Sequence, residues 1–216
     1  MSETWVRSLS GAVFGVVVIG MVFAHPMTNA ALWAAVSALA VREFKQGARK
    51  VSLSTVWGFA AFVALWMCMV IGLPWQSSGG YEPSVLLSLV FVIWASDTGA
   101  YFVGKPLGRH KLMPAVSPGK SWEGLAGGAV SAALVAYALW GATLVWVGPL
   151  MAVLGTAGDL VESSWKRRNG LKDSGAIMPG HGGVMDRFDG FMFTVPVYFV
   201  LLSLLPFEFA LKAILP

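Results

Sequence analysis

Acidic and basic side chains gather between residues 159 and 189, at spacings that suit the transfer of a phosphate-containing group. This segment holds five of the chain's eleven acidic residues beside five basic ones. If the preceding apolar segment continues as a helix, Asp159 and Glu162 share one face, and Ser163 and Lys166 follow on it. Two carboxylates one turn apart can hold a divalent cation such as Mg²⁺. The alternative is a solvated helix end with a Glu162–Lys166 ion pair.

A glycine-rich turn follows at 179–183, with His181 among three glycines. Glycines such as Gly182 and Gly183 let the backbone adopt positive φ and approach a ligand closely. Exposed N–H groups in such turns form concavities that bind anions. His181 could donate to a phosphate oxygen or move a proton. The alternative is a plain hairpin loop.

A second pair of carboxylates, Asp186 and Asp189, leads into the last apolar segment, and Arg187 between them points elsewhere. The two carboxylates either interact favourably with the positive end of that helix or form a second ligand pair for a metal.

Carboxylates, lysines, arginines and a glycine-rich turn in one segment are together typical of phosphoryl or nucleotidyl transfer. Such reactions depend mainly on in-line positioning and on neutralising the charge of phosphate oxygens.

The connection 104–123 provides a second basic surface. It contains Lys120 between Ser117 and Ser121. The sequence is not a Walker A phosphate-binding loop, because Pro114 stands where the first glycine is required. We expect a turn that presents Lys120 and a serine to a phosphate, with Ser121 as a helix N-cap, or else a plain connecting turn.

Asp97 lies within the fourth apolar segment, which the run 96–101 is expected to interrupt. An ionisable residue within a membrane span is a candidate functional residue. Asp97 would either hold a cation or substrate, or serve as the structural partner of a nearby lysine.

The elements that must position these residues are membrane helices. Of 216 residues, 56% are hydrophobic and 12% are charged, about half the usual charged share of roughly 25%. The fold class is all-α, a polytopic integral membrane protein with about seven spans of about 20 residues each. Pro149 either kinks the sixth span or marks its start. The expected spans are 8–25, 28–41, 52–73, 85–103, 123–140, 142–158 and 190–205.

The basic residues predict the orientation. In the seven-span arrangement with the N-terminus inside, 14 of the 15 Lys and Arg fall on one side, and only Lys212 falls on the other. The positive-inside rule assigns that side to the cytoplasm. Residues 1–26 are interpreted as the first span and not as a cleaved leader, because no small-residue cleavage site follows. The single cysteine, Cys68, excludes a disulfide framework and a cysteine-based zinc site.

These motifs resemble the phosphatidate cytidylyltransferase family. Its signature has a serine and a Lys-Arg pair, then Lys-Asp, a Pro-x-His-Gly-Gly turn and Asp-Arg-x-Asp. The matching runs here are 163–167, 172–173, 179–183 and 186–189, with 96–101, 117–124 and 158–163 also similar. The resemblance covers roughly residues 94–190. Trp165 and Met178 depart from the family's usual aliphatic residues or Phe, and the N-terminal half is shorter than in typical bacterial members.

The resemblance implies transfer of the cytidylyl group of CTP to phosphatidate, giving CDP-diacylglycerol and pyrophosphate. It implies Mg²⁺ as the cofactor, leaves open a second cation, and suggests a homodimer; no nucleic-acid partner is expected. The active site would face the cytoplasm at the inner cell membrane. Residues 1–216 would form one catalytic domain, with N-terminal helices in 1–84 and a catalytic half in 85–205 that carries cytoplasmic loops 104–122 and 159–189.

The resemblance also implies roles for individual residues. Carboxylates would bind metal, basic residues and His181 would act on the phosphates, and residues of the other loop would complete the substrate site. The metal ligands would be Asp159, Glu162, Asp186 and Asp189; the catalytic residues Lys166, Arg167, Lys172, Asp173, His181 and Arg187; and the substrate-binding residues Asp97, Ser117, Lys120, Ser121, Ser163, Gly182 and Gly183.

Three alternatives remain at this point. A related CTP-using membrane enzyme, such as a polyprenol kinase or a CDP-archaeol synthase, would differ in its released product or its lipid. A transporter would place ionisable groups near the membrane midplane in repeated broken helices, whereas here most of them lie at one interface. The third alternative is a membrane subunit without activity.

Overall fold

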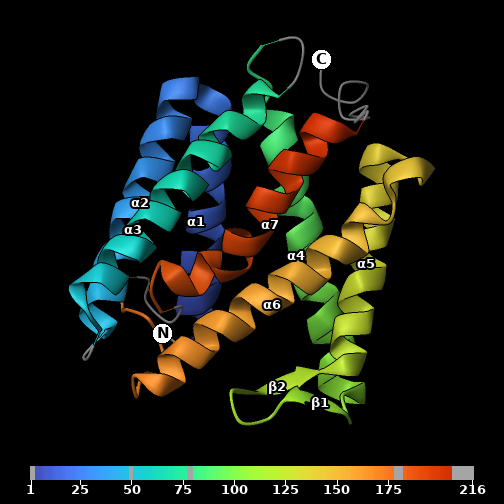
Figure 1. Ribbon diagram of the computed structural model, residues 1–216. Coiled ribbons are helices and arrows are strands. Elements are labelled where there is room, and N and C mark those ends of the chain that lie inside the picture. The colour runs from blue at the N-terminus through green and yellow to red at the C-terminus, as the bar shows by residue number, and fades with distance from the viewer. Residues whose placement is uncertain (1–2, 49–50, 77–79, 178–181, 206–216) are drawn as a thin grey trace. The chain divides into compact units, whose positions relative to one another are not determined.

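The computed structural model describes residues 3–48, 51–76, 80–177 and 182–205, and the side chains from residue 11 onward. Within these ranges, the main elements are seven α-helices and one two-stranded sheet (Figure 1). In chain order they are α1 (Glu3–Ala24), α2 (Pro26–Gly47), α3 (Leu53–Gly72), α4 (Pro83–Leu107), β1 (Lys111–Met113), β2 (Ser117–Ser121), α5 (Trp122–Trp140), α6 (Val147–Arg168) and α7 (Met185–Leu204), with short 3₁₀ turns at Leu73–Trp75 and Ala142–Leu144.

Five stretches of the described chain are long and apolar enough to cross a membrane. They are Leu53–Trp75, Pro83–Leu107, Trp122–Trp140, Ala142–Arg168 and Met185–Leu204. A shorter apolar helix covers Gly11–Ala24. The all-α membrane class is thereby confirmed, while seven spans and a cytoplasmic N-terminus remain predictions.

The chain divides into two compact units, which are described separately. Unit 1 comprises Met1–Gly72 and Ser164–Asp189; unit 2 comprises Leu73–Ser163 and Gly190–Pro216. Both α6 and α7 pass from one unit to the other along the chain. The prediction that residues 1–216 form one catalytic domain stays a prediction.

The core of unit 1 is built on aromatic side chains. The buried Trp33 ring of α2 meets Trp66 of α3 and Phe188 of α7 edge to face, at centroid distances of 5.6 and 5.3 Å. The indole N–H of Trp33 donates to Asn29 at 2.8 Å. Aromatic pairs in this geometry contribute attraction beyond their buried area, so they hold the start of α7 against α2.

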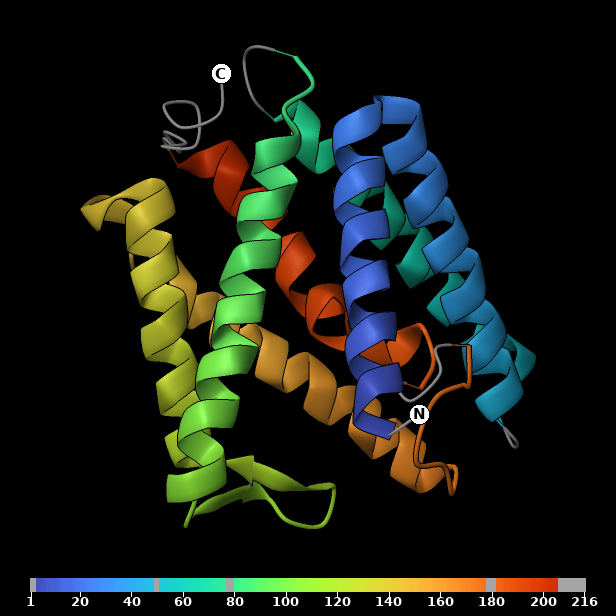
Figure 2. The same cartoon turned by 180° about the vertical axis from the view of Figure 1, so that it is seen from behind.

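In unit 2, helices α4 and α5 pack through small residues. They lie side by side in both views (Figures 1 and 2). A Cβ added at Gly127 would meet Val103 at 2.5 Å, and one added at Gly128 would meet the Ser96 carbonyl oxygen at 2.8 Å. Small residues allow such close approach in membrane helices. The Gly124-x-x-x-Gly128 spacing therefore serves this contact.

The connection between α4 and α5 is an antiparallel hairpin, which the all-α prediction missed. Lys111 pairs with Ser121, and Met113 pairs with Ser117. Glu123 closes its base, because His110 approaches the Glu123 carboxylate through Nδ1 at 2.6 Å. The predicted loop 104–122 is therefore partly helix and partly hairpin.

Three predictions about the spans differ from the observed helices. The fourth span is not interrupted at 96–101, since α4 runs unbroken from Pro83 to Leu107. The sixth was expected at 142–158; the candidate span also begins at Ala142 but extends to Arg168, and its helix α6 runs from Val147 to Arg168, so Pro149 lies in the first turn of α6 and marks its start. The seventh was expected from 190, but α7 begins at Met185. Hydropathy marks where the apolar part of a helix ends, and these helices continue into polar sequence.

Candidate active site

The predicted site residues fall into two groups, one in each unit. Unit 1 contains Lys166 to Asp189, and unit 2 contains Asp97, the hairpin serines with Lys120, and the α6 residues up to Ser163. His181 lies outside the described residues, so its role stays a prediction.

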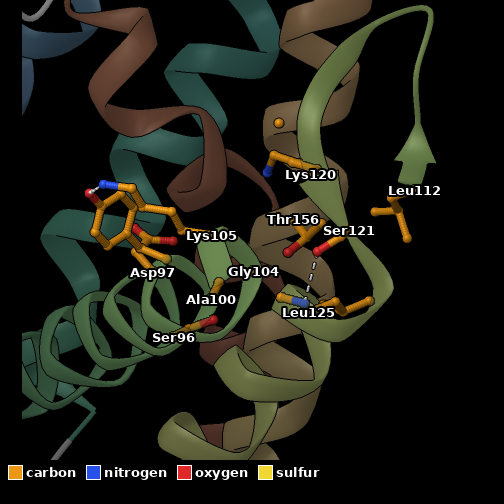
Figure 3. A pocket seen from close by; sticks show the side chains of 13 residues that line it. Ser96, Asp97, Ala100, Gly104, Lys105, Leu112, Lys120, Ser121, Leu125 and Thr156 are labelled. Carbon is orange, nitrogen blue, oxygen red and sulfur yellow. Dashed lines mark hydrogen bonds between the residues drawn. The ribbon is translucent and has the colours of Figure 1, made fainter. Parts of the chain in front are cut away.

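Unit 2 has a cavity of about 410 Å³ between α4, the hairpin, α5 and α6 (Figure 3). Its lining includes three predicted substrate-binding residues, Asp97, Lys120 and Ser121. Ser117, the fourth residue predicted on these two elements, is not among the described residues that line the cavity. Sequence reasoning gave no site role to Lys105 and Tyr101, which also line it and are joined by a hydrogen bond of 2.9 Å from Nζ to Oη. A cavity with two lysines suits an anionic ligand.

Ser121 has the capping role that the sequence predicted. Its backbone is extended, and its hydroxyl accepts a hydrogen bond from the Gly124 N–H at 3.1 Å, as the dashed line in Figure 3 marks. An N-cap satisfies one of the free N–H groups at the start of a helix. Ser121 thus fixes where α5 begins, directly after Lys120.

Lys120 and Asp159 form an ion pair in unit 2. Lys120 Nζ lies 2.5 Å from Asp159 Oδ2, and the two side chains are 25% and 34% exposed. The other oxygen, Oδ1, accepts a hydrogen bond from Ser163 Oγ at 3.1 Å. Glu162 is buried one turn from Asp159 on the same helix. The predicted shared face of these residues on a continuing helix is confirmed.

In unit 1 the same kind of pair is buried. Lys166 Nζ lies 2.5 Å from Asp186 Oδ1, and the side chains are 9% and 7% exposed. The second oxygen, Oδ2, accepts three hydrogen bonds: from Ser174 N at 2.8 Å, Ser174 Oγ at 2.9 Å and Gly183 N at 2.7 Å. Asp186 is therefore bound through both of its oxygens.

Gly182 and Gly183 have a role that the sequence did not predict. Gly182 has φ of +81°, and a Cβ there would meet Asp186 Oδ2 at 2.5 Å. A Cβ at Gly183 would meet Glu43 Oε2 at 2.5 Å. Here the close approach is to the protein's own carboxylates. Contact of Gly182 and Gly183 with a substrate stays a prediction.

The other predicted basic residues of unit 1 are on the surface. Arg167 donates from Nη1 to the Leu171 carbonyl at 2.9 Å, which closes the turn after α6. Lys172 and Asp173 are exposed on that turn. Arg187 is exposed on the first turn of α7, while Asp189 is half-buried one turn further along. Their substrate and metal roles are not decided by these positions.

Sequence reasoning missed Glu43, near the C-terminal end of α2. The residue is only 2% exposed, and its carboxylate accepts hydrogen bonds from Ser174 Oγ, Val184 N and Met185 N. One signal was available in the sequence, since Glu3 and Glu43 are the only acidic residues before Glu82. A solitary carboxylate at the end of an apolar helix is costly unless it has partners.

A model of the Cytidylyltransferase family matches residues 49–205. The phosphatidate cytidylyltransferase of Bacillus subtilis (strain 168) is 41% identical over 157 residues, which cover 68% of this chain and 58% of that protein. The phosphatidate cytidylyltransferases of Staphylococcus saprophyticus subsp. saprophyticus and Staphylococcus aureus (strain COL) are each 44% identical over 127 residues, covering 54% of this chain and 48% of theirs. The chain spans about half the length of the curated relatives it matches.

Proposed function

The chain belongs to the Cytidylyltransferase family, and from that premise we propose that it transfers the cytidylyl group of CTP to phosphatidate. The products are CDP-diacylglycerol and pyrophosphate. The observation that carries the proposal is the family match over 49–205, a range that holds both lysine–aspartate pairs and the cavity. The names of the relatives supply the lipid substrate.

In this reaction a phosphate oxygen of phosphatidate forms a bond to the α-phosphorus of CTP. The bond from that phosphorus to the bridging oxygen breaks, and pyrophosphate leaves with the electron pair. Charge on the phosphate oxygens must be neutralised while the reacting atoms are held in line. Lys120 at the cavity, and Lys166, Arg167, Lys172 and Arg187 around the start of α7 and the end of α6, would provide this charge.

The Lys120–Asp159 pair supports a role in binding the nucleotide. Lys120 lines the cavity of unit 2, and both members of the pair are partly exposed. A pair in contact with water gains little net energy, so a triphosphate can replace Asp159 as the partner of Lys120. Asp97 and Ser121 line the same cavity. Ser117 and Ser163 remain proposed contacts.

We propose Mg²⁺ as the cofactor, held by carboxylates. The chain offers two pairs spaced by one helical turn, Asp159 with Glu162 on α6 and Asp186 with Asp189 on α7. Carboxylate oxygens are the ligands that Mg²⁺ prefers, so the donor set fits the ion. When bound, a divalent ion would neutralise phosphate oxygens and polarise the α-phosphorus. A second cation and a homodimer are further proposals from the family.

We also propose that the protein lies in the inner cell membrane with seven spans and its active site on the cytoplasmic side. The charge distribution supports this, because 14 of the 15 Lys and Arg fall on one side of a seven-span arrangement. A single cysteine at Lys111→Cys, in a Cys68→Ser background, should react with a membrane-impermeant maleimide only in inside-out vesicles. Labelling from the outside of intact cells would contradict the orientation.

The activity is tested by pyrophosphate release from purified protein in detergent, with CTP, dioleoyl phosphatidate and Mg²⁺. We expect release that requires both the lipid and the metal, shown by lipid-free and EDTA controls. The same assay with a polyprenol or an archaeal lipid phosphate tests the related enzymes. Release with those acceptors and not with phosphatidate would contradict the proposed lipid substrate.

A further inference from the structure

The carboxylate of Glu43 is bound to a segment more than 130 residues away in the sequence. Within unit 1, Oε1 accepts from Val184 N at 2.9 Å, and Oε2 accepts from Met185 N at 2.9 Å. Ser174 Oγ lies 3.0 Å from Oε2. Glu43 is only 2% exposed and is removed from water, so these three donors satisfy the oxygens of its carboxyl group.

Two of these bonds fix the start of α7. Met185 is the first residue of that helix, and Val184 directly precedes it. The first N–H groups of a helix have no partner within it, and a negative charge there is favourable for the helix dipole. A local side chain usually provides such a cap; here a distant glutamate does so. Asp186, the next residue, therefore depends on Glu43 for its position.

The third bond leads to Asp186 through a shared hydroxyl. Ser174 Oγ lies 3.0 Å from Glu43 Oε2 and 2.9 Å from Asp186 Oδ2. One hydroxyl carries one proton, so it bridges the two carboxylates and cannot fully satisfy both. The Ser174 N–H and the Gly183 N–H complete the set at Oδ2. One oxygen of Asp186 is thus held by the backbone, and the other, Oδ1, faces Lys166.

Space around Glu43 is also fully used. A Cβ at Gly175 would meet Oε1 at 2.5 Å, and one at Gly183 would meet Oε2 at 2.5 Å and Oε1 at 2.6 Å. Cβ atoms are essentially never found this close to another heavy atom. The carboxylate therefore sits in a tight cradle of backbone, and small displacements of it move Ser174 and Gly183.

We propose that Glu43 is a positioning residue for Asp186. It fixes Ser174 and the start of α7, these hold Oδ2 of Asp186, and Oδ1 is left as the oxygen that can change partners from Lys166 to a metal or to the reacting complex. The inference rests on the proposed function for its last step only. The anchoring itself is a property of unit 1.

The test compares Glu43→Gln with Glu43→Asp, and uses Glu82→Gln as a matched control. The amide of Gln has one acceptor oxygen and one NH₂ group, which cannot accept from Val184 N or Met185 N. Asp keeps the charge on a shorter side chain. Glu82 precedes α4 in unit 2 and accepts from Ser84 Oγ at 2.7 Å, so its substitution also removes a carboxylate beside a helix start.

The first readout is hydrogen–deuterium exchange of the Val184 and Met185 amides, which requires no activity. Loss of one hydrogen bond to a charged group should speed their exchange about tenfold or more in Glu43→Gln. Glu82→Gln should leave it unchanged. Unchanged exchange in a folded Glu43→Gln protein would overturn the anchoring.

The second readout is the split between kcat and KM in the pyrophosphate assay. We expect kcat of Glu43→Gln to fall about tenfold to a hundredfold, with KM for CTP little changed, a higher Mg²⁺ concentration for half-activation, and partial recovery in Glu43→Asp. A purely structural role would lower the yield of folded protein without moving the Mg²⁺ midpoint, and that result would overturn the proposal.

If Glu43→Gln does not fold, the same two measurements are made on Ser174→Ala, which removes only the bridging hydroxyl. Wild-type protein without lipid-dependent pyrophosphate release would contradict the proposed function, while the exchange experiment would still test Glu43.

Discussion

Two lysine–aspartate pairs of the same length have different surroundings. Lys120–Asp159 in unit 2 and Lys166–Asp186 in unit 1 are both 2.5 Å between nitrogen and oxygen. The first has side chains 25% and 34% exposed, whereas the second has 9% and 7%. Water competes for the first pair and hardly reaches the second. The difference indicates that a ligand replaces Asp159 beside Lys120 more easily than it replaces Asp186 beside Lys166, because the second oxygen of Asp186 is also held by Ser174 and Gly183.

The energies of such pairs follow their burial. An exposed ion pair contributes about 0–1 kcal/mol, so a phosphate can replace one member at little cost. Breaking a buried pair by removing one member costs about 3–5 kcal/mol, because the other charge is left without compensation. Substitutions at the two pairs should therefore separate stability from activity.

The largest effect is expected from Asp186→Asn, which removes the carboxylate that pairs with the buried Lys166 ammonium. We expect loss of activity and a decrease in the free energy of unfolding of about 3–5 kcal/mol, measured by denaturant unfolding in detergent. The double variant Lys166→Met, Asp186→Asn removes both charges and should regain much of this stability but no activity. A single variant as stable as wild type would contradict the assignment of this pair to the buried core.

For the partly exposed Lys120–Asp159 pair, we expect a large effect on activity and a small effect on stability. Lys120→Ala should lower kcat/KM for CTP about a hundredfold, the effect of removing one preorganised donor to a developing negative charge. Its free energy of unfolding should change by less than about 1 kcal/mol. Lys111→Ala, an exposed lysine on the same hairpin, is the control and should affect neither quantity much. Equal effects of the two substitutions on kcat/KM would contradict a specific role for Lys120.

Substitutions at two glycines, one beside each lysine–aspartate pair, test the same comparison. Gly182→Ala places a methyl group at positive φ against Asp186 Oδ2 and should cost about 1–3 kcal/mol of stability through backbone strain. Gly119→Ala, in the hairpin, has open space around the added carbon and should change stability by about 0.5 kcal/mol or less. Thermal unfolding of the two variants measures the difference. Similar midpoints would mean that the cradle around Asp186 relaxes freely.

The smallest effect is expected at the start of α5. Ser121→Ala removes the side-chain cap and should cost about 1 kcal/mol, seen as a small decrease in the thermal midpoint. Ser203→Ala, an exposed serine in the last turn of α7, is the control. A neutral Ser121→Ala would show that the hairpin fixes the start of α5 without the cap.

The sequence predicted the helices better than it predicted their ends. All seven expected spans overlap an observed helix, and the shared face of Asp159 and Ser163 was correct, because helical periodicity is a local property. The continuation of α6 to Arg168 was missed by hydropathy, since charged residues end an apolar run without ending a helix. The hairpin was missed because its strands of three and five residues have no clear alternation.

Long-range partners could not be predicted from the sequence. The spacing of Asp186 and Asp189 predicted a carboxylate pair, but nothing local connects Glu43 with Ser174 or Met185. Gly182 and Gly183 were predicted to lie close to a ligand, and that contact stays a prediction, since the close approach that the structure shows is to other groups. The approaching groups, the carboxylates of Asp186 and Glu43, became known only when distant segments were placed together.

The central claim is the transfer of the cytidylyl group to phosphatidate. The most direct test is to measure which labelled phosphate of CTP enters the lipid. Purified protein is incubated with phosphatidate, Mg²⁺ and CTP labelled either at the α-phosphate or at the γ-phosphate, and the lipid is extracted. The account predicts that the α-label enters the lipid, that the γ-label leaves as pyrophosphate, and that EDTA abolishes both. Label from the γ-phosphate in the lipid would identify a kinase, and the absence of both labels from the lipid would contradict the proposed activity.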